Sequence, residues 1–263
     1  MQRPDFIIGG ATRSGSRKLR SILSAHPHIL IPGEPRDQFF QKDMRHVKPL
    51  ENGAPVAVKP SAQRLLRGEW EANPQRAARY CPNAKIIFTL RNPVSRAYSQ
   101  FWKAKTEGKE KVPTFEEALN EEMDGRRKPE TSRLCWISKN QYQLHLDEWL
   151  SEYKSEQVLI LIMEEWIDSP ESGLAPLEKF LGLEPSSLGR LPEAQPRKRS
   201  EPGFFDKLFP RGHQTKMAVR PPMSPDARQA LEDIFAPDKL YVANMLDRYE
   251  IATWKRDADL AEN

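Results

Sequence analysis

Short apolar runs alternate along the chain with segments whose apolar residues recur at helical spacing. Four runs predict buried strands, at residues 5–8, 56–59, 84–90 and 157–163. Helices are expected over 16–25, 74–80, 94–105, a segment that begins at Thr114, 140–153 and 176–181, and one or two helices are expected over 225–249. This alternation predicts an α/β fold, with a central, mainly parallel sheet flanked by helices. We expect a single domain over residues 1–263, with a long loop at about 184–225.

Composition narrows the class of protein. The chain has 263 residues, of which 38% are hydrophobic, and its mean hydropathy is -0.71. Its longest strongly apolar run, residues 158–163, is far shorter than the roughly 20 residues of a membrane span. The N-terminal apolar stretch is too short for a secretory signal. Two cysteines, Cys81 and Cys135, exclude a disulfide framework and a four-cysteine zinc site. We therefore expect a cytoplasmic protein with reduced thiols.

Charge is unevenly distributed along the chain. Residues 190–220 contain eight basic and three acidic residues, whereas residues 221–263 contain five basic and nine acidic ones. A basic segment of this kind is a solvated surface, a nucleic-acid patch or an anion-binding loop, and composition alone leaves all three open.

The first strand is followed by a glycine-containing turn, residues 10–16, which we call the phosphate loop. Its two glycines, Gly10 and Gly15, have the spacing that lets main-chain N–H groups converge on an anion at a helix N-terminus. A Walker loop would place lysine directly after the second glycine, but Ser16 stands there, and the cation is Arg13. An ordinary strand-to-helix turn would give the same pattern.

A second candidate site follows the strand at residues 84–90. Arg91 lies at the carboxyl end of this strand, where open α/β sheets bind ligands, and Ser99 follows on the next helix. Arg91 offers a planar set of donors for a phosphate, and Ser99 offers a hydroxyl. Pairing of Arg91 with a nearby acid is the alternative.

Together these blocks resemble a known enzyme family. PDFIIGGATRSGSRKLRSILSAHP is similar to the first strand, 5'-phosphosulfate loop and first helix of PAPS-dependent sulfotransferases. PNAKIIFTLRNPVSRAYSQFW resembles the same family's 3'-phosphate motif, an arginine and a serine in an R-x-P-x-x-R-x-x-S frame. The heparan sulfate type is the nearest, in a soluble, bacterial-type form. The resemblance covers residues 4–183 and resumes faintly at PPMSPDARQALEDIF.

The resemblance implies the sulfotransferase fold and transfer of a sulfuryl group from PAPS to a hydroxyl or amine. The acceptor would be a carbohydrate or a small molecule, the product PAP (3',5'-ADP), and no metal would be needed. The residues that would bind PAPS are Arg13, Ser14, Gly15, Ser16 and Arg17 at the phosphosulfate, Arg91 and Ser99 at the 3'-phosphate, and Arg211, Gly212, Lys216 and Arg220 in a loop that closes over the nucleotide.

The resemblance also suggests catalytic residues. Arg13 replaces the family's lysine and is a poor proton donor, so Lys59 would stabilise charge on the bridging oxygen. The family's general base is a glutamate shortly after the His-Pro of the first helix. Glu34 matches its Glu-Pro form, whereas Asp37 matches its spacing to a Phe-Phe pair, so both remain candidates.

Other functions remain open. A P-loop kinase, a nucleic-acid-binding module and a sulfotransferase-like protein that binds PAP without turnover are the alternatives, although we expect no nucleic-acid partner. Four aromatic residues line an acceptor cleft or belong to the core: Trp70, Trp102, Trp136 and Tyr142.

Overall fold

The computed structural model describes residues 4–30, 63–67, 73–129, 132, 134–188 and 220–259. The strands are β1 (Phe6–Gly10), β2 (Ile29–Leu30), β3 (Gln63–Arg67), β4 (Lys85–Leu90) and β5 (Val158–Ile162). The helices of the first half are α1 (Ser16–Ala25), α2 (Pro74–Tyr80), α3 (Pro93–Thr106) and α4 (Phe115–Met123). Those of the second half are α5 (Tyr142–Leu150), α6 (Met163–Trp166), α7 (Pro170–Gly173), α8 (Ala175–Leu181), α10 (Pro225–Met245) and α11 (Ala252–Asp259), and 3-10 turns lie at Ser138–Asn140 and Ser155–Gln157.

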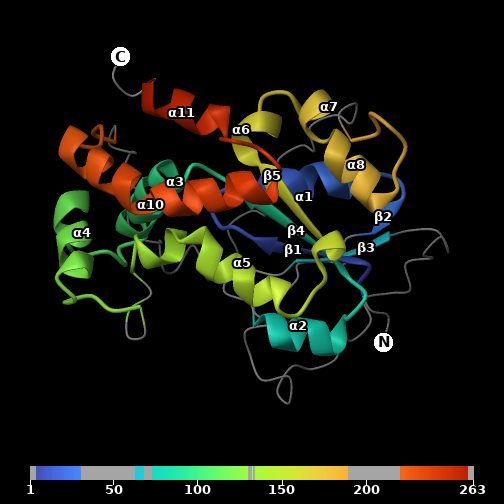
Figure 1. The fold of residues 1–263 in the computed structure, drawn as a ribbon, viewed down its shortest axis with the longest axis horizontal. Helices are drawn as coiled ribbons and strands as arrows, with labels where there is room; N and C mark the ends of the chain where they lie inside the picture. Colours follow the sequence, from blue (N-terminus) through green and yellow to red (C-terminus); the bar gives the residue numbers. More distant parts are fainter. Residues whose placement is uncertain are drawn as a thin grey trace, which may run out of the picture.

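The five strands form one parallel sheet in the order β2-β3-β1-β4-β5, as Figure 1 shows. The chain runs from β1 toward β2 on one side and later crosses to β4 on the other. The carboxyl ends of β1 and β4 therefore form the point at which the strand order reverses. Open parallel sheets bind their ligands at such a point. The predicted α/β class and parallel sheet are confirmed.

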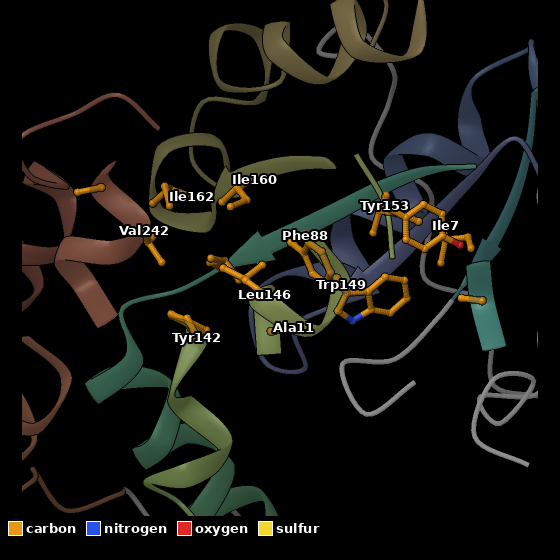
Figure 2. Packing of buried hydrophobic residues seen from close by; sticks show 14 of the residues in the cluster. Ile7, Ala11, Phe88, Tyr142, Leu146, Trp149, Tyr153, Ile160, Ile162 and Val242 are labelled. Carbon is orange, nitrogen blue, oxygen red and sulfur yellow. The ribbon is translucent and has the colours of Figure 1, made fainter. Parts of the chain in front are cut away.

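Alternating residues of the central strands supply the two faces of the core. Ile86 and Phe88 of β4 pack on one face with Trp149 of α5, whereas Ile87 packs on the other with Leu23 of α1. The edge of Phe88 meets the Trp149 ring at 5.6 Å between centroids, and Figure 2 shows both side chains beneath the sheet. Both faces of β4 are buried, as expected of a parallel strand covered by helices.

Helices cover both faces of the sheet. In Figure 1, α2 and α5 lie on one side, and α1 and α8 lie on the other. A third apolar cluster joins α3, α4 and α10 beside the sheet. In the part of the chain that the structure describes, no helix combines the length and the apolarity that crossing a membrane requires.

Most predicted elements are found, with shifted ends. The helices at 16–25 and 74–80 have the predicted bounds. The helix predicted at 140–153 is shorter, because a 3-10 turn precedes Tyr142 and the helix ends at Leu150. Two C-terminal helices are found, one of the two expected alternatives, but the predicted range is wrong, since α10 ends at Met245 and α11 lies beyond residue 249.

Two strands were not predicted. β2 has two residues, and β3 has the polar-rich sequence QRLLR, so neither shows a clear apolar run. The predicted strand at 56–59 lies outside the described residues, as does most of the predicted long loop.

Candidate functional site

The phosphate loop connects the end of β1 to the start of α1 at the point where the strand order reverses. Gly15 precedes α1 with a φ of 80°, and Arg13 also has a positive φ, 66°. The N-cap residue of α1 is Gly15, which has no side chain to cap this end of the helix. The helix therefore begins at a tight, glycine-dependent turn, where its positive end favours an anion.

Hydrogen bonds from strand β4 hold the phosphate loop in place. The Ala11 N–H donates to the Thr89 carbonyl at 2.9 Å, and the Thr89 hydroxyl donates to the Ser14 carbonyl at 2.8 Å. Trp166 donates its indole N–H to the same Thr89 hydroxyl at 3.2 Å. Thr89 is completely buried, so these bonds fix the loop against the neighbouring strand.

Ser14 belongs mainly to this internal support. Its N–H donates to the Ala11 carbonyl at 3.3 Å, a hydrogen bond within the loop. Its buried hydroxyl makes no hydrogen bond to a described residue and lies near the Tyr142 phenol. Burial raises the pKa of Tyr142, and the Ser14 hydroxyl is among the neighbours that oppose this rise.

Arg13 and Ser99 meet at the open side of the loop. The Arg13 Nε donates to the Ser99 Oγ at 2.9 Å, across 86 residues of sequence. Ser99 lies on α3, which begins at Pro93 with the Asn92 side chain as its N-cap. The two predicted anion-binding elements, the phosphate loop and the Arg91–Ser99 segment, are therefore adjacent.

Four arginines bring positive charge to this place. Burial lowers the pKa of Arg13 most, and the charges of Arg220, Arg91 and Arg17 lower it further, while Glu107 opposes them. Arginine remains protonated in proteins at neutral pH, so these guanidinium groups repel one another without an anion between them. The structure thus brings together all four of the described arginines that were predicted to bind the nucleotide. We call them the arginine cluster.

The Arg91 side chain has a donor that no described residue uses. Its Nε is buried and has no hydrogen-bond partner among the described residues. Its main chain is fixed, because the Tyr142 hydroxyl donates to the Arg91 carbonyl at 2.6 Å and accepts from the Arg91 N–H at 3.4 Å. A buried donor without a partner is costly, and a phosphate oxygen would satisfy it.

The remaining predicted site residues lie outside the described part of the chain. They are Glu34, Asp37, Lys59, Arg211, Gly212 and Lys216. Of the candidate acceptor aromatics, Tyr142 and Trp136 are buried in the core, and the partly buried Trp102 packs against it. Trp70 is not described.

Sequence reasoning missed the residues that support the site. Arg96, Thr89 and Asn140 are buried polar side chains whose partners lie far away in the sequence. Arg96 is the second arginine of the R-x-P-x-x-R-x-x-S frame. That position was the signal in the sequence that could have marked it as a site residue. The segment after β5 gives another support, since Glu164 accepts the Asn92 N–H at 2.9 Å.

Comparison with known proteins places the chain in a family. A family model described as "Sulfotransferase domain" matches residues 3–195. A bifunctional heparan sulfate N-deacetylase/N-sulfotransferase 1 from Caenorhabditis briggsae is 28% identical, over 97% of this chain and 32% of that protein. The human heparan sulfate glucosamine 3-O-sulfotransferase 3B1 is 27% identical, over 69% of this chain and 47% of that protein. The chain thus spans about a third of the length of the first of these relatives and about half of the second.

Solved structures show the same fold. A sulfotransferase from Alicyclobacillus acidocaldarius superposes with a TM-score of 0.68 and 22% identity, covering 97% of this chain and 100% of that one. Mouse sulfotransferase SULT7A1, solved in complex with PAP, gives a TM-score of 0.54 and 16% identity, covering 91% and 86% of the two chains. With a family match over most of its length and the fold to go with it, this chain belongs to the sulfotransferase family of transferase enzymes.

Proposed function

We propose that the protein is a PAPS-dependent sulfotransferase that acts on a hydroxyl or amine of a carbohydrate or small-molecule acceptor. The observation that carries this proposal is the arginine cluster at the carboxyl ends of β1 and β4, where the Arg91 Nε has no hydrogen-bond partner among the described residues. PAPS carries a 5'-phosphosulfate and a 3'-phosphate, so it suits a site with two adjacent anion-binding elements.

In the proposed binding mode, the phosphate loop holds the phosphosulfate and the Arg91–Ser99 segment holds the 3'-phosphate. Arg13 and the N-terminus of α1 stabilise negative charge on the phosphosulfate. Arg91 and Ser99 distinguish the nucleotide from one without a 3'-phosphate. Arg220 is exposed and its charge reaches Arg13, which supports a role for the preceding segment, with Arg211, Gly212 and Lys216, as a cover over the nucleotide.

The proposed reaction is an in-line displacement at sulfur. The acceptor oxygen or nitrogen forms a bond to sulfur while the bond from sulfur to the bridging oxygen breaks, and PAP leaves with that electron pair. The acceptor proton passes to the carboxylate of Glu34 or Asp37. Lys59 and Arg13 stabilise the charge that develops on the leaving phosphate, while the fold supplies positioning.

The relatives suggest the acceptor class. The two curated proteins are named for heparan sulfate and its glucosamine, which supports a sugar acceptor with a hydroxyl or amine. Fold alone does not carry substrate identity, so the acceptor test uses pools of glycans and of small metabolites.

The decisive experiment measures whether Arg91 binds the 3'-phosphate. Calorimetric titration with PAP and with AMP should show tighter binding of PAP to the wild type. In Arg91→Gln, PAP binding should fall about 10- to 100-fold, the worth of a charge-assisted hydrogen bond, with AMP binding nearly unchanged. The matched control is Arg79→Gln, which removes one positive charge from an exposed position on α2.

Turnover completes this test. Radiolabelled PAPS should transfer its sulfuryl group to a member of an acceptor pool, and either Glu34→Gln or Asp37→Asn, but not both, should abolish transfer while PAP still binds. Equal binding of PAP and AMP by the wild type, or turnover that requires ATP and Mg²⁺ in place of PAPS, would overturn the proposal.

A further inference from the structure

Arg96 is a buried cation at the centre of the structure that carries the site. It is 1% exposed and lies on α3, five residues after Arg91 and three before Ser99. A buried arginine is stable only where its donors are satisfied, so its partners show what the fold uses it for.

The partners of Arg96 include the phosphate loop. Its Nε donates to the Thr12 carbonyl at 2.8 Å, and its Nη1 donates to the Lys139 carbonyl at 2.8 Å and to the Asn140 Oδ1 at 2.7 Å. Asn140 donates in turn to the Gln100 side chain at 3.0 Å, and Gln100 donates to the Thr12 hydroxyl at 3.3 Å. Thr12 directly precedes Arg13, so this network fixes the part of the loop that bears the cation.

The same guanidinium also contacts the support of Arg91. Its central carbon lies 5.6 Å from the centroid of the Tyr142 ring, a cation–π distance. The Tyr142 hydroxyl holds the main chain of Arg91 by the two hydrogen bonds described above. A short path of contacts therefore runs from Thr12 through Arg96 and Tyr142 to Arg91.

We propose that Arg96 is a positioning residue that sets the separation between the phosphate loop and Arg91, so that the two phosphates of a 3',5'-bisphosphate nucleotide are recognised together. This inference rests on the proposed function. Thr89 holds the loop at Ala11 and Ser14, while Arg96 holds Thr12 between them, so the two supports act on different parts of the loop. A lysine cannot replace Arg96, because one ammonium cannot span the same set of acceptors.

The test compares ligands with one and with two phosphates. We expect Arg96→Lys and Arg96→Gln to weaken PAP binding tenfold or more, measured by calorimetry. Binding of AMP and of adenosine 3'-phosphate should each change threefold or less, because either subsite alone can adjust to a single phosphate. The KM for PAPS should rise by a larger factor than kcat falls.

Arg127→Gln is the matched control. Arg127 is also a buried arginine, but it pairs with Glu110 and Glu121, away from the loop. It should lower the melting temperature at least as much as the Arg96 variants and leave the ratio of PAP to AMP affinity within threefold. If Arg96→Gln does not fold, Tyr142→Phe removes the hydroxyl that holds Arg91, and it should weaken PAP tenfold with AMP within threefold.

Two results would overturn the inference. Loss of affinity by the same factor for all three ligands, or PAP binding unchanged within threefold, would show that Arg96 does not couple the subsites. In either case the proposed function stands, provided that the wild type prefers PAP to AMP. A wild type without that preference would overturn the proposed function and the inference together.

Discussion

At the residue scale, Gly15 is subject to two separate requirements. Its φ of 80° lies in the left-handed region, which an L residue adopts at a cost of about 1–2 kcal/mol. A β-carbon at this position would also lie 2.8 Å from the Trp166 ring and 3.1 Å from the Met163 side chain. The phosphate loop is therefore packed directly against the start and end of α6, which leaves no room for a larger residue.

The first prediction concerns Gly15→Ala. The substitution should displace the loop from Trp166, because the new methyl group cannot fit, and should weaken both the fold and PAP binding. Gly125→Ala is the matched control, since Gly125 has a φ of 71° and open space at its β-carbon. Urea unfolding should show a loss larger than the control's by about 1–3 kcal/mol, the usual cost of overpacking.

Equal losses in the two variants would contradict this reading. They would mean that backbone strain alone limits position 15 and that Trp166 yields to the methyl group. A Gly15→Ala variant that binds PAP as tightly as the wild type would also show that the loop geometry tolerates the shift.

At the element scale, a buried ion pair ties the loop before α4 to the loop after it. Arg127 donates to Glu110 at 2.6 Å and to Glu121 at 2.6 Å, and Glu110 also accepts the N–H groups of Lys111 and Val112. The side chain of Glu110 is 1% exposed. Burial acts to raise the pKa of Glu110, but the hydrogen bonds and charge of Arg127, with the main-chain donors, outweigh it and hold the pKa below its usual 4.5.

The second prediction follows from the sign of this shift. Because the folded state binds the Glu110 proton more weakly than the unfolded state, its contribution to the free energy of unfolding is complete above pH 4.5. It is lost as the pH falls below that value and through the lowered pKa of the folded state. Glu110→Gln should cost about 3 kcal/mol at pH 7, since it leaves Arg127 buried with one partner fewer.

Denaturant unfolding between pH 7 and pH 3 checks this prediction. The difference between wild type and Glu110→Gln should shrink as the solution becomes acidic. Glu148→Gln, at an exposed position on α5, serves as the control and should show a small difference. A Glu110→Gln difference that grows on acidification has the wrong sign and would rule the interpretation out.

Elements with local signals were predictable, and those without were not. The helix at Pro74–Tyr80 has an Asn73 cap and a proline in its first turn, and β4 has an apolar run at its centre. The signals for both elements therefore lie in adjacent residues. β3 has only two apolar residues, Leu65 and Leu66, between polar ones, so its sequence shows no strand pattern, and its place beside β1 depends on pairing.

The candidate site divides in the same way. Arg13, Arg91 and Ser99 could be selected because each lies at a strand end or in a motif. The contacts that hold them join residues far apart, as when Arg96 reaches Thr12 across 84 positions. No pattern within one segment contains that information, since it arises only when the strands are ordered in the sheet.

At the scale of the whole molecule, helix α11 packs against the segment that follows Arg91. Trp254 is 2% exposed, and its indole N–H donates to the Glu164 carboxylate at 3.1 Å. Its carbonyl accepts from the Asn92 side chain at 2.8 Å, and Glu164 also accepts the Asn92 N–H at 2.9 Å. Asn92 directly follows Arg91, so three distant segments fix the residue next to the proposed 3'-phosphate donor.

The third prediction tests the contribution of Trp254 to these contacts. Trp254→Ala should lower the free energy of unfolding by about 3–5 kcal/mol, because it empties a large buried volume. Trp254→Phe keeps most of the volume and should cost about 1–2 kcal/mol through the lost hydrogen bond. Both should weaken PAP binding, which calorimetry measures. Tyr249→Ala, at a side chain that is 92% exposed, is the control and should change stability by less than about 0.5 kcal/mol. Similar stability of Trp254→Ala and the control would show that α11 is not part of the cooperative fold.

The bond between Asn92 and Trp254 spans 162 positions, and this has a consequence for synthesis. A ribosome has made the phosphate loop, β4 and Arg91 long before it makes Trp254. Until then, Asn92 and Glu164 lack one of their partners, and the strand end that bears Arg91 is incompletely held. The proposed nucleotide site is therefore among the last parts of the molecule to reach its final form, and a chain released early carries the sequence motifs without the geometry that holds them in place.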